Sequence, residues 1–202
     1  MKPVILLIGG ATGTGKSTVA TEVAHRLGIN RITCTDVVRQ TLRAFFGPDV
    51  KPAIHRSSFD TPPGVPVVDA FLEQTSEVLV AVEAAVSRAI LEGRSAVVEG
   101  VHVVPGMLTV SAADATVVEC VLTREDEEAH AEHFWIRDAA SGGERPVQKY
   151  LDHLADIRRL QDYLVERARA NDVPVFENTN VQETVSAVIE LVLGNTAELK
   201  AV

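Results

Sequence analysis

The chain has 202 residues, and 19 lysines and arginines against 28 aspartates and glutamates give it a formal net charge of -9. Hydrophobic residues make up 46% of the chain and charged residues 23%, which provides enough apolar surface for a core and excludes a mainly disordered protein. The acidic balance argues against nucleic-acid partners, which need a basic surface. No apolar run reaches the roughly 18 residues of a membrane-spanning helix, which argues against a membrane partner.

The two cysteines, Cys34 and Cys120, make neither a disulfide framework nor a C-x-x-C pair. We therefore expect them to be small buried hydrophobes in a reduced, cytoplasmic protein. The apolar stretch at 4–8 meets Gly-Gly and a lysine rather than a small-residue cleavage site. It is interpreted as a buried strand and not as a signal peptide.

The period of the apolar residues, with Gly, Pro and capping residues as boundaries, predicts alternating strands and helices. In chain order these are a strand at 4–8, a helix at 17–27, a strand at 31–33, helices at about 36–46 and 69–91, strands at 96–99 and 116–122, a helix at 147–170, a strand at 174–177 and a helix at 181–193. The alternation indicates an α/β fold, a five-stranded parallel sheet with helices on both faces. Its ligand site is expected beyond the carboxyl ends of the strands.

Two segments fall outside this alternation. Residues 47–66 hold five of the nine prolines and show no clear periodicity, and loops of this length are usually functional or disordered. Residues 123–145 are strongly charged and end in Ser141-Gly142-Gly143, which is typical of a hinged excursion from the core. The size of the chain suits a single domain over 1–202 that carries this excursion as a lid.

The turn after the first strand carries the pattern G-x-x-x-x-G-K-[ST] between a strand and a helix, the context that gives this motif its meaning. Its glycines let the loop fold around an anion, while backbone N–H groups and the dipole of the following helix attract phosphate. The lysine of such a loop reaches the β- and γ-phosphates, and the next hydroxyl binds Mg²⁺. The residues predicted to bind the nucleotide are Gly10, Gly13, Gly15, Lys16, Ser17 and Thr18. The motif does not separate a kinase from an ATPase. A GTPase would be expected to have an Asn-Lys-x-Asp segment, and the chain has none.

Asp36 and Arg39 lie three residues apart where the second strand ends and a helix begins. A carboxylate and a guanidinium facing one cleft suit an acceptor with a hydroxyl and an anionic group, with Asp36 as base or orienter. The alternative for Asp36 is an ordinary helix-terminus carboxylate. The loop that follows is rich in donors, which suits a phosphate or carboxylate pocket as well as a solvated loop. Its predicted acceptor-binding residues are His55, Arg56, Ser57 and Ser58.

Several segments together resemble the 2-phosphoglycerate kinase family. They are Gly-Gly-Ala-Thr-Gly-Thr-Gly-Lys-Ser-Thr at 9–18, Thr-Asp-Val-Val-Arg at 35–39, Ile-His-Arg-Ser-Ser-Phe at 54–59 and Val-Glu-Gly-Val-His-Val-Val-Pro-Gly at 98–106, with further similarity at 157–164 and 173–178. The resemblance spans nearly the whole chain. It implies a P-loop NTPase fold of the adenylate-kinase type with a helical lid.

The activity that this resemblance implies is ATP- and Mg²⁺-dependent phosphorylation of a hydroxyl on 2-phosphoglycerate or a similar phosphorylated glycerate, giving a bisphosphate and ADP. Two departures limit it. Archaeal members resembling this core carry an additional N-terminal ATP-cone domain, whereas here the first strand begins at residue 4. A plant branch with a similar core is linked to phytic-acid accumulation, so the reaction class is better defined than the acceptor.

Similar kinases also suggest roles for other residues. Thr18 is placed for the α-phosphate, and Asn178 follows the fifth strand, where the adenine-binding loop of such kinases lies. Glu99 ends the third strand, so it is assigned with Ser17 to the Mg²⁺ shell and also to the substrate site. The catalytic residues are then predicted to be Lys16, Asp36 and, in the lid, Arg137, which would stabilise charge on the transferring group.

Three histidines are interpreted more cautiously. His102 is predicted to contact the acceptor, and a structural histidine is the alternative. His130 and His133 are expected on a solvated face of the lid, because a zinc site would need a third ligand. The competing functions are a kinase for another hydroxylated anion, such as an inositol phosphate or a sugar acid, and an ATP-binding regulator. The cationic candidates all fall on segments expected at one end of the sheet, which predicts a locally basic cleft.

Overall fold

The structure is a computed structural model that describes residues 2–111, 113–140 and 147–198, without the side chains at 137, 139, 140 and 198. Its strands are β1 (Val4–Gly9), β2 (Ile32–Cys34), β3 (Ala96–Glu99), β4 (Thr116–Thr123) and β5 (Val175–Glu177). Its helices are α1 (Lys16–Arg26), α2 (Thr35–Phe45), the 3-10 helix η1 (Ala53–His55), α3 (Val67–Leu91), α4 (Glu127–Ala140), α5 (Val147–Asp152), α6 (Leu154–Ala170) and α7 (Val181–Glu198).

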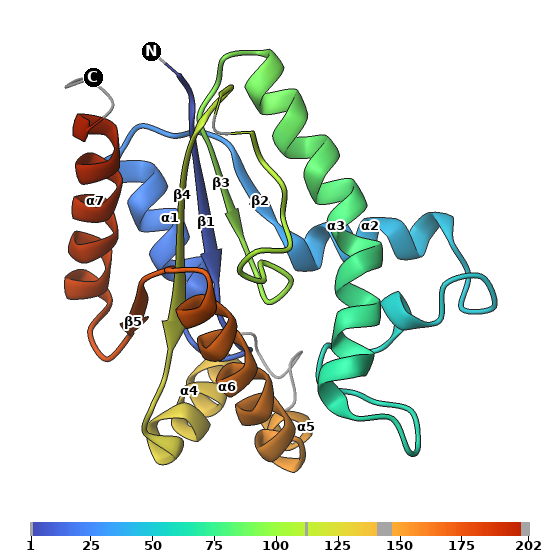
Figure 1. The fold of residues 1–202 in the computed structure, drawn as a ribbon. Helices are drawn as coiled ribbons and strands as arrows, with labels where there is room; N and C mark the ends of the chain where they lie inside the picture. The colour runs from blue at the N-terminus through green and yellow to red at the C-terminus, as the bar shows by residue number, and fades with distance from the viewer. Residues whose placement is uncertain (1, 112, 141–146, 199–202) are drawn as a thin grey trace.

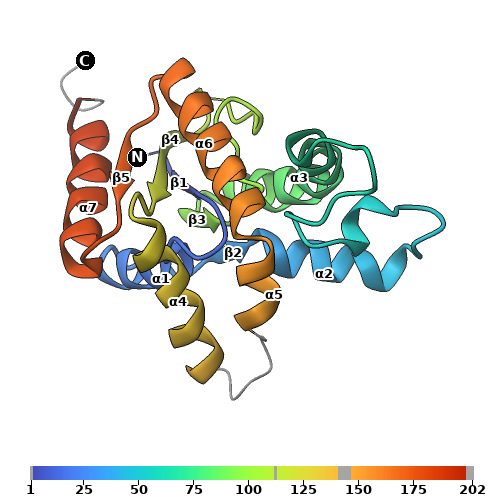
Figure 2. The same ribbon diagram turned by 90° about the horizontal axis from the view of Figure 1, so that it is seen from below.

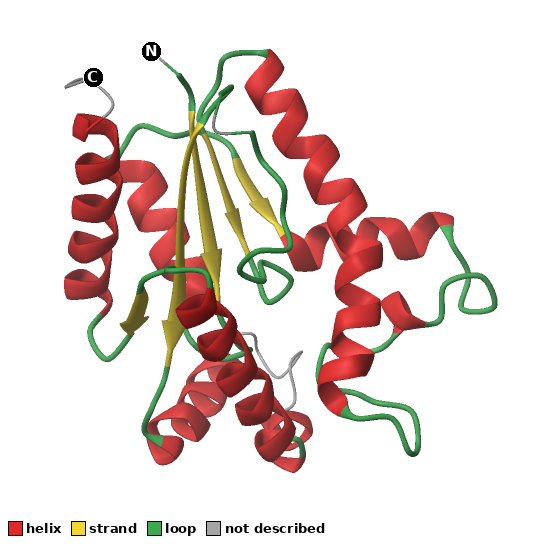
Figure 3. Cartoon of the chain, in the orientation of Figure 1, coloured by secondary structure: helices red, strands yellow, loops and turns green. Residues whose placement is uncertain are grey.

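The five strands form one parallel sheet in the order β2-β3-β1-β4-β5. The predicted five-stranded parallel α/β fold is confirmed. All carboxyl ends lie at one edge of such a sheet, and in Figure 1 this edge is the lower one, where α4 and α5 also lie. The segment between α2 and α3 is largely irregular, as Figure 3 shows, and only η1 interrupts it.

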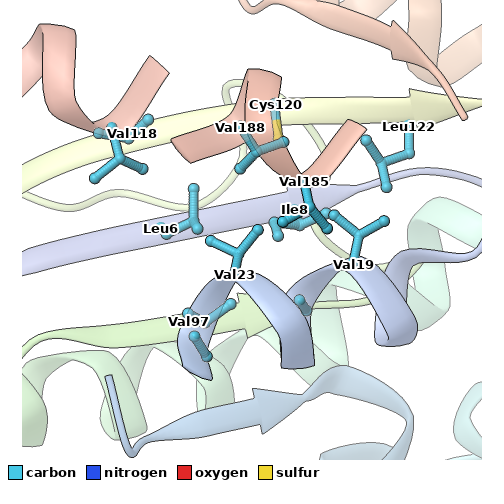
Figure 4. Close-up of a cluster of buried hydrophobic side chains, with 13 residues drawn as sticks. Leu6, Ile8, Val19, Val23, Val97, Val118, Cys120, Leu122, Val185 and Val188 are labelled. Carbon is cyan, nitrogen blue, oxygen red and sulfur yellow. The ribbon is translucent and has the colours of Figure 1, made fainter. Parts of the chain in front are cut away.

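Helices cover both faces of the sheet, with α1 and α7 on one face and α3 and α6 on the other (Figure 2). The side chains of a strand point alternately to the two faces. Leu6 and Ile8 of β1 therefore pack with α1 and α7 (Figure 4), whereas Ile5 and Leu7 pack with α3. All four are at most 1% exposed, which explains why this strand is a continuous apolar run in the sequence.

The expected helix at 147–170 is wrong in one respect, because the chain breaks at His153 between α5 and α6. The His153 ring packs 5.2 Å from the Phe59 ring, and its Nε2 lies 3.4 Å from Oδ1 of Asp60. These contacts with the 47–66 segment outweigh a local helical preference, which is weak for each residue. None of the helices in the described ranges is both long and apolar enough to span a membrane.

Candidate active site

The phosphate-loop motif folds as a tight loop between the central strand β1 and helix α1. Gly10, Gly13 and Gly15 have φ values of 141°, 92° and 82°, a region that favours glycine because it has no Cβ. Inside the loop, Nζ of Lys16 donates to the carbonyl of Ala11 at 2.6 Å, and the side chain is 9% exposed. The lysine ammonium and the positive N-terminus of α1 therefore lie at the same loop, as anion binding requires.

Ser17 and Glu99 meet where two neighbouring strands end. Glu99 lies opposite Ile8 in the register of β1 and β3, so its carboxylate ends beside the loop. Ser17 Oγ donates to Glu99 Oε1 at 3.0 Å, and Glu99 is 4% exposed. Hydroxyl and carboxylate oxygens are the hard ligands that Mg²⁺ prefers. The donor set at this position therefore fits the metal that the sequence predicts.

Cys34 lies next to this pair and is half-buried, whereas Cys120 is buried in the core. The expectation of two buried cysteines thus holds only for Cys120. Burial, together with the hydrogen bond and the negative charge of Glu99, raises the pKa of the Cys34 thiol to about 11. The thiol therefore stays protonated and unreactive near neutral pH.

A cavity of about 550 Å³ extends from the phosphate loop to the start of α2, and His133 of α4 and Tyr150 of α5 also line it. Eight predicted site residues line it, namely Gly13, Gly15, Lys16, Ser17, Thr18, Asp36, Arg39 and Glu99. Gly10 is outside the lining; a Cβ there would meet Oγ1 of Thr14 at 2.9 Å. Nucleotide-side and acceptor-side candidates thus share one cavity.

The charges that line this cavity are balanced among the side chains that the structure describes. Lys16 and Arg39 are its cations, and Asp36 and Glu99 are its anions. The expectation of a locally basic cleft is therefore not met by these side chains. The predicted lid cation Arg137 lies in α4, and its side chain is outside the described part of the chain.

Arg39 joins α2 to the 47–66 segment. Its Nη1 donates to the carbonyls of Ile54 and Arg56, each at 2.9 Å, and its Nε lies 3.4 Å from Oδ1 of Asp36. These contacts use three of the five guanidinium donors, and the two hydrogens on Nη2 are not involved in them. The Asp36 side chain is 63% exposed on the cavity side of α2. A carboxylate in this position is accessible to an acceptor hydroxyl.

The donors predicted in the 47–66 segment are His55, Arg56, Ser57 and Ser58. None of them lines the cavity in the described part of the chain. His55 Nε2 lies 2.7 Å from the carbonyl of Phe46, and Arg56 donates to Glu73 at 2.8 Å. Ser58 is buried at 8% exposure. In this conformation these side chains hold the segment in shape rather than form an anion pocket.

His102 is not part of the cavity lining and is fully buried. Its Nδ1 lies 3.0 Å from Oγ1 of Thr35, and its Nε2 lies 2.9 Å from Oε1 of Gln74. The Gln74 amide nitrogen donates to the carbonyls of Ala53 and Arg56 at 2.6 and 3.1 Å. Gln74 Oε1 must therefore accept from His102 Nε2–H, and His102 Nδ1 accepts from the Thr35 hydroxyl. Burial lowers the pKa of His102 to about 4, so the ring is neutral.

Helix α4, in the segment predicted as a lid, contacts the phosphate loop through His130, so the expectation that this histidine lies on a solvated face is wrong. His130 is fully buried, and its Nε2 lies 2.8 Å from the carbonyl of Thr12. Its ring stacks on Phe134 one turn later, with 5.4 Å between the centroids. Because the neighbouring residues are acidic, the sequence does not indicate that this face of α4 is buried. The spacing of four residues between His130 and Phe134 is the feature that could have indicated it.

Asn178 is hydrogen-bonded to the backbone of the phosphate loop. It is 2% exposed, and its Nδ2 donates to the carbonyl of Thr14 at 2.8 Å. Asn180 caps α7, because its Oδ1 accepts from the backbone nitrogens of Gln182 and Glu183 at 2.9 and 3.4 Å. These bonds satisfy two free backbone donors at the start of the helix. The contact of Asn178 with adenine stays a prediction.

Three residues contact the cavity or the 47–66 segment and were not predicted from the sequence, namely Tyr150, Gln74 and Lys149. Gln74 breaks the apolar stripe of α3 between Phe71 and Val78, and a buried polar residue on such a stripe is the signal that was overlooked. Tyr150 lines the cavity. Lys149 has no such signal, because a lysine is ordinary on the exposed side of a helix.

A parallel sheet in this order, with the glycine loop after its central strand, defines a P-loop kinase fold. Solved structures with this fold include a shikimate kinase from Acinetobacter baumannii, with a TM-score of 0.54, 16% identity and coverage of 96% of this chain and 95% of that chain. A gluconokinase from Sinorhizobium meliloti has a TM-score of 0.53 and 15% identity over 98% and 93% of the two chains. At such low identity these two structures show the fold alone. No family model matches the chain.

Curated sequences define the family more closely. A 2-phosphoglycerate kinase of Pyrococcus horikoshii is 41% identical over 98% of this chain and 66% of its own length. That of Methanothermobacter thermautotrophicus is 36% identical over 98% of this chain and 68% of its own. The chain belongs to the 2-phosphoglycerate kinase family. It spans roughly two thirds of the length of these curated relatives.

Proposed function

We propose that the chain is an ATP-dependent kinase that phosphorylates the hydroxyl of 2-phosphoglycerate or a similar phosphorylated glycerate, giving a bisphosphate and ADP. The observation that carries this proposal is the shared cavity, which is lined by Lys16 and Ser17 of α1 and by Asp36 and Arg39 of α2. The relatives named 2-phosphoglycerate kinase support the choice of acceptor. Two free cysteines agree with a reduced, cytoplasmic setting.

Each residue then has a definite part in the transfer. The acceptor hydroxyl approaches the γ-phosphorus, Asp36 accepts its proton, and the bond between the γ-phosphorus and the β–γ bridging oxygen breaks. Lys16 and the backbone N–H groups of the loop neutralise charge on the phosphates. Bound Mg²⁺ would further neutralise this charge, with Ser17 and Glu99 as the residues that hold it. Arg39 binds the anionic group of the acceptor in this proposal.

An acceptor panel tests this proposal. Release of ADP from Mg-ATP is followed with 2-phosphoglycerate, 3-phosphoglycerate, glycerate, an inositol phosphate and a sugar acid. We expect 2-phosphoglycerate to give the highest kcat/KM. Faster turnover with the inositol phosphate or the sugar acid would move the assignment to another kinase, and ATP turnover indifferent to every acceptor would favour the regulator.

A further inference from the structure

Four aromatic rings form a continuous column between the phosphate loop and the 47–66 segment. The ring centroids of His130 and Phe134 lie 5.4 Å apart, and those of Phe134 and Tyr150 lie 5.0 Å apart with an angle of 14° between the planes. Tyr150 then meets Phe59 edge-on at 5.7 Å. All three separations are within the range of favourable aromatic pairs. The column thus crosses from α4 to α5 and from α5 to the 47–66 segment.

The first end of the column is fixed on the backbone of the phosphate loop. Besides the 2.8 Å contact of His130 Nε2 with the Thr12 carbonyl, the two rings pack directly on Gly13. A Cβ at Gly13 would lie 2.7 Å from Cε1 of Phe134 and 2.8 Å from Nε2 of His130. The rings therefore touch the loop at the glycine that turns it, so a shift of the loop must displace them.

The second end is fixed on the acceptor side by polar contacts. Lys149 Nζ donates to Ser57 Oγ at 2.8 Å and lies 3.4 Å from Oδ2 of Asp60. Phe59 is 3% exposed between these residues, and the Lys149 ammonium lies 5.7 Å from its ring centroid. Asp60 also accepts from the backbone nitrogen of Ser57 at 3.1 Å. The short segment 57–60 is thus held by polar contacts with α5, in addition to the packing of Phe59 in the core.

We propose that His130 is a positioning residue that couples the phosphate loop to Arg39 on the acceptor side of the cavity. The ring column transmits the position of the loop to residues 57–60, and the same segment holds Arg39 through the carbonyls of Ile54 and Arg56. Nucleotide binding fixes the loop, the loop fixes His130 and Phe134, and these rings fix Tyr150 and Phe59. The 47–66 segment, and with it Arg39, is then ordered before the acceptor arrives, which gives positive cooperativity between the two substrates. The proposal rests on nucleotide binding at the loop and does not depend on which acceptor is bound.

Amide hydrogen exchange tests this coupling without any acceptor. The full chain is measured with and without Mg²⁺ and the non-hydrolysable analogue AMP-PNP, and exchange is compared in peptides that cover 10–18 and 56–60. We expect the analogue to slow exchange in both peptides, on the order of tenfold at 56–60, a size typical of coupling between sites. Slowing at 10–18 with no change at 56–60 would overturn the proposal, even if the kinase assay succeeds.

Three variants locate the effect on the column. His130→Phe keeps the ring and removes the hydrogen bond to Thr12, and His130→Gln restores a donor without the ring. We expect both to lose most of the protection at 56–60 while protection at 10–18 remains. Trp135→Leu is the matched control, because Trp135 is the next residue after Phe134 in α4 and is 56% exposed. Equal protection at 56–60 in the control and in both His130 variants would contradict the proposed route.

Discussion

Ser17 donates its hydroxyl hydrogen to Glu99 across 3.0 Å, which joins the first turn of α1 to the end of β3. Glu99→Gln keeps an oxygen that can accept this bond and removes the charge that a divalent cation needs. We expect activity to fall roughly 10- to 100-fold, with a higher Mg²⁺ concentration for half-maximal rate. Rates measured over a Mg²⁺ titration check this. Glu190→Gln on the exposed face of α7 is the control, and an unchanged Mg²⁺ dependence in Glu99→Gln would refute the assignment.

Lys16 lies inside the loop with its ammonium on the Ala11 carbonyl. Lys16→Ala should reduce phosphoryl transfer by about a thousandfold, because the developing phosphate charge loses a fixed cation. The thermal midpoint should change little, since the glycines and not the lysine set the loop. Steady-state rates and a melting curve on the same sample test both statements. Retained transfer would count against the whole site.

Arg39 has both a structural and a binding contribution, which two variants separate. Arg39→Ala removes the donor from the carbonyls of Ile54 and Arg56 and should cost about 1–3 kcal/mol of stability. Arg39→Lys keeps the positive charge but loses the planar set of guanidinium donors. We therefore expect KM for the acceptor to rise about tenfold. KM for ATP should stay near its wild-type value in both variants. If only KM for ATP rose, Arg39 would bind the nucleotide rather than the acceptor, which contradicts this assignment.

The buried His102 makes stability depend on pH. The unfolded histidine titrates near 6.5, whereas burial lowers the pKa of His102 to about 4 in the folded protein. Between these values the unfolded state binds more protons, so stability falls as the pH drops from 6.5 to about 4. The linked loss is roughly 3 kcal/mol. Urea unfolding of the wild type and of His102→Gln at several pH values measures it, and parallel pH profiles would show that His102 is not the cause.

Gly100 follows the last residue of β3, and its conformation and surroundings favour glycine. Its φ is 147°, and a Cβ there would overlap the side chain of Thr35. Gly100→Ala should therefore destabilise the fold by about 1–3 kcal/mol through backbone strain, and by more if Thr35 is displaced from His102. Gly47→Ala is the control, because a Cβ at Gly47 meets nothing within 4 Å. Equal melting temperatures for the two variants would contradict this reading.

The sheet and the phosphate loop could be predicted because local signals define them. The apolar run at 4–8 and the glycines after it are recognised from neighbouring residues in the sequence. Asp36 and Arg39 were found because carboxyl ends of parallel strands meet at one edge. These features need no knowledge of long-range packing.

The parts that were missed depend on contacts between distant segments. The sequence predicts His130 as a solvated residue. Its burial depends on the contact with the carbonyl of Thr12, 118 positions earlier in the chain. The helix break at His153 depends on Phe59 and Asp60. His102 was predicted as a substrate contact with a structural alternative, and the hydrogen bonds to Thr35 and Gln74 favour the alternative.

Transfer of label from γ-labelled ATP to 2-phosphoglycerate is the most direct measurement of the proposed activity. The wild-type chain is incubated with Mg²⁺ and both substrates, and the products are separated by anion exchange. The account predicts label in a bisphosphoglycerate in equal amount to the ADP formed, and about a thousandfold slower formation of this product with Lys16→Ala. ADP formation with all label in inorganic phosphate would contradict it.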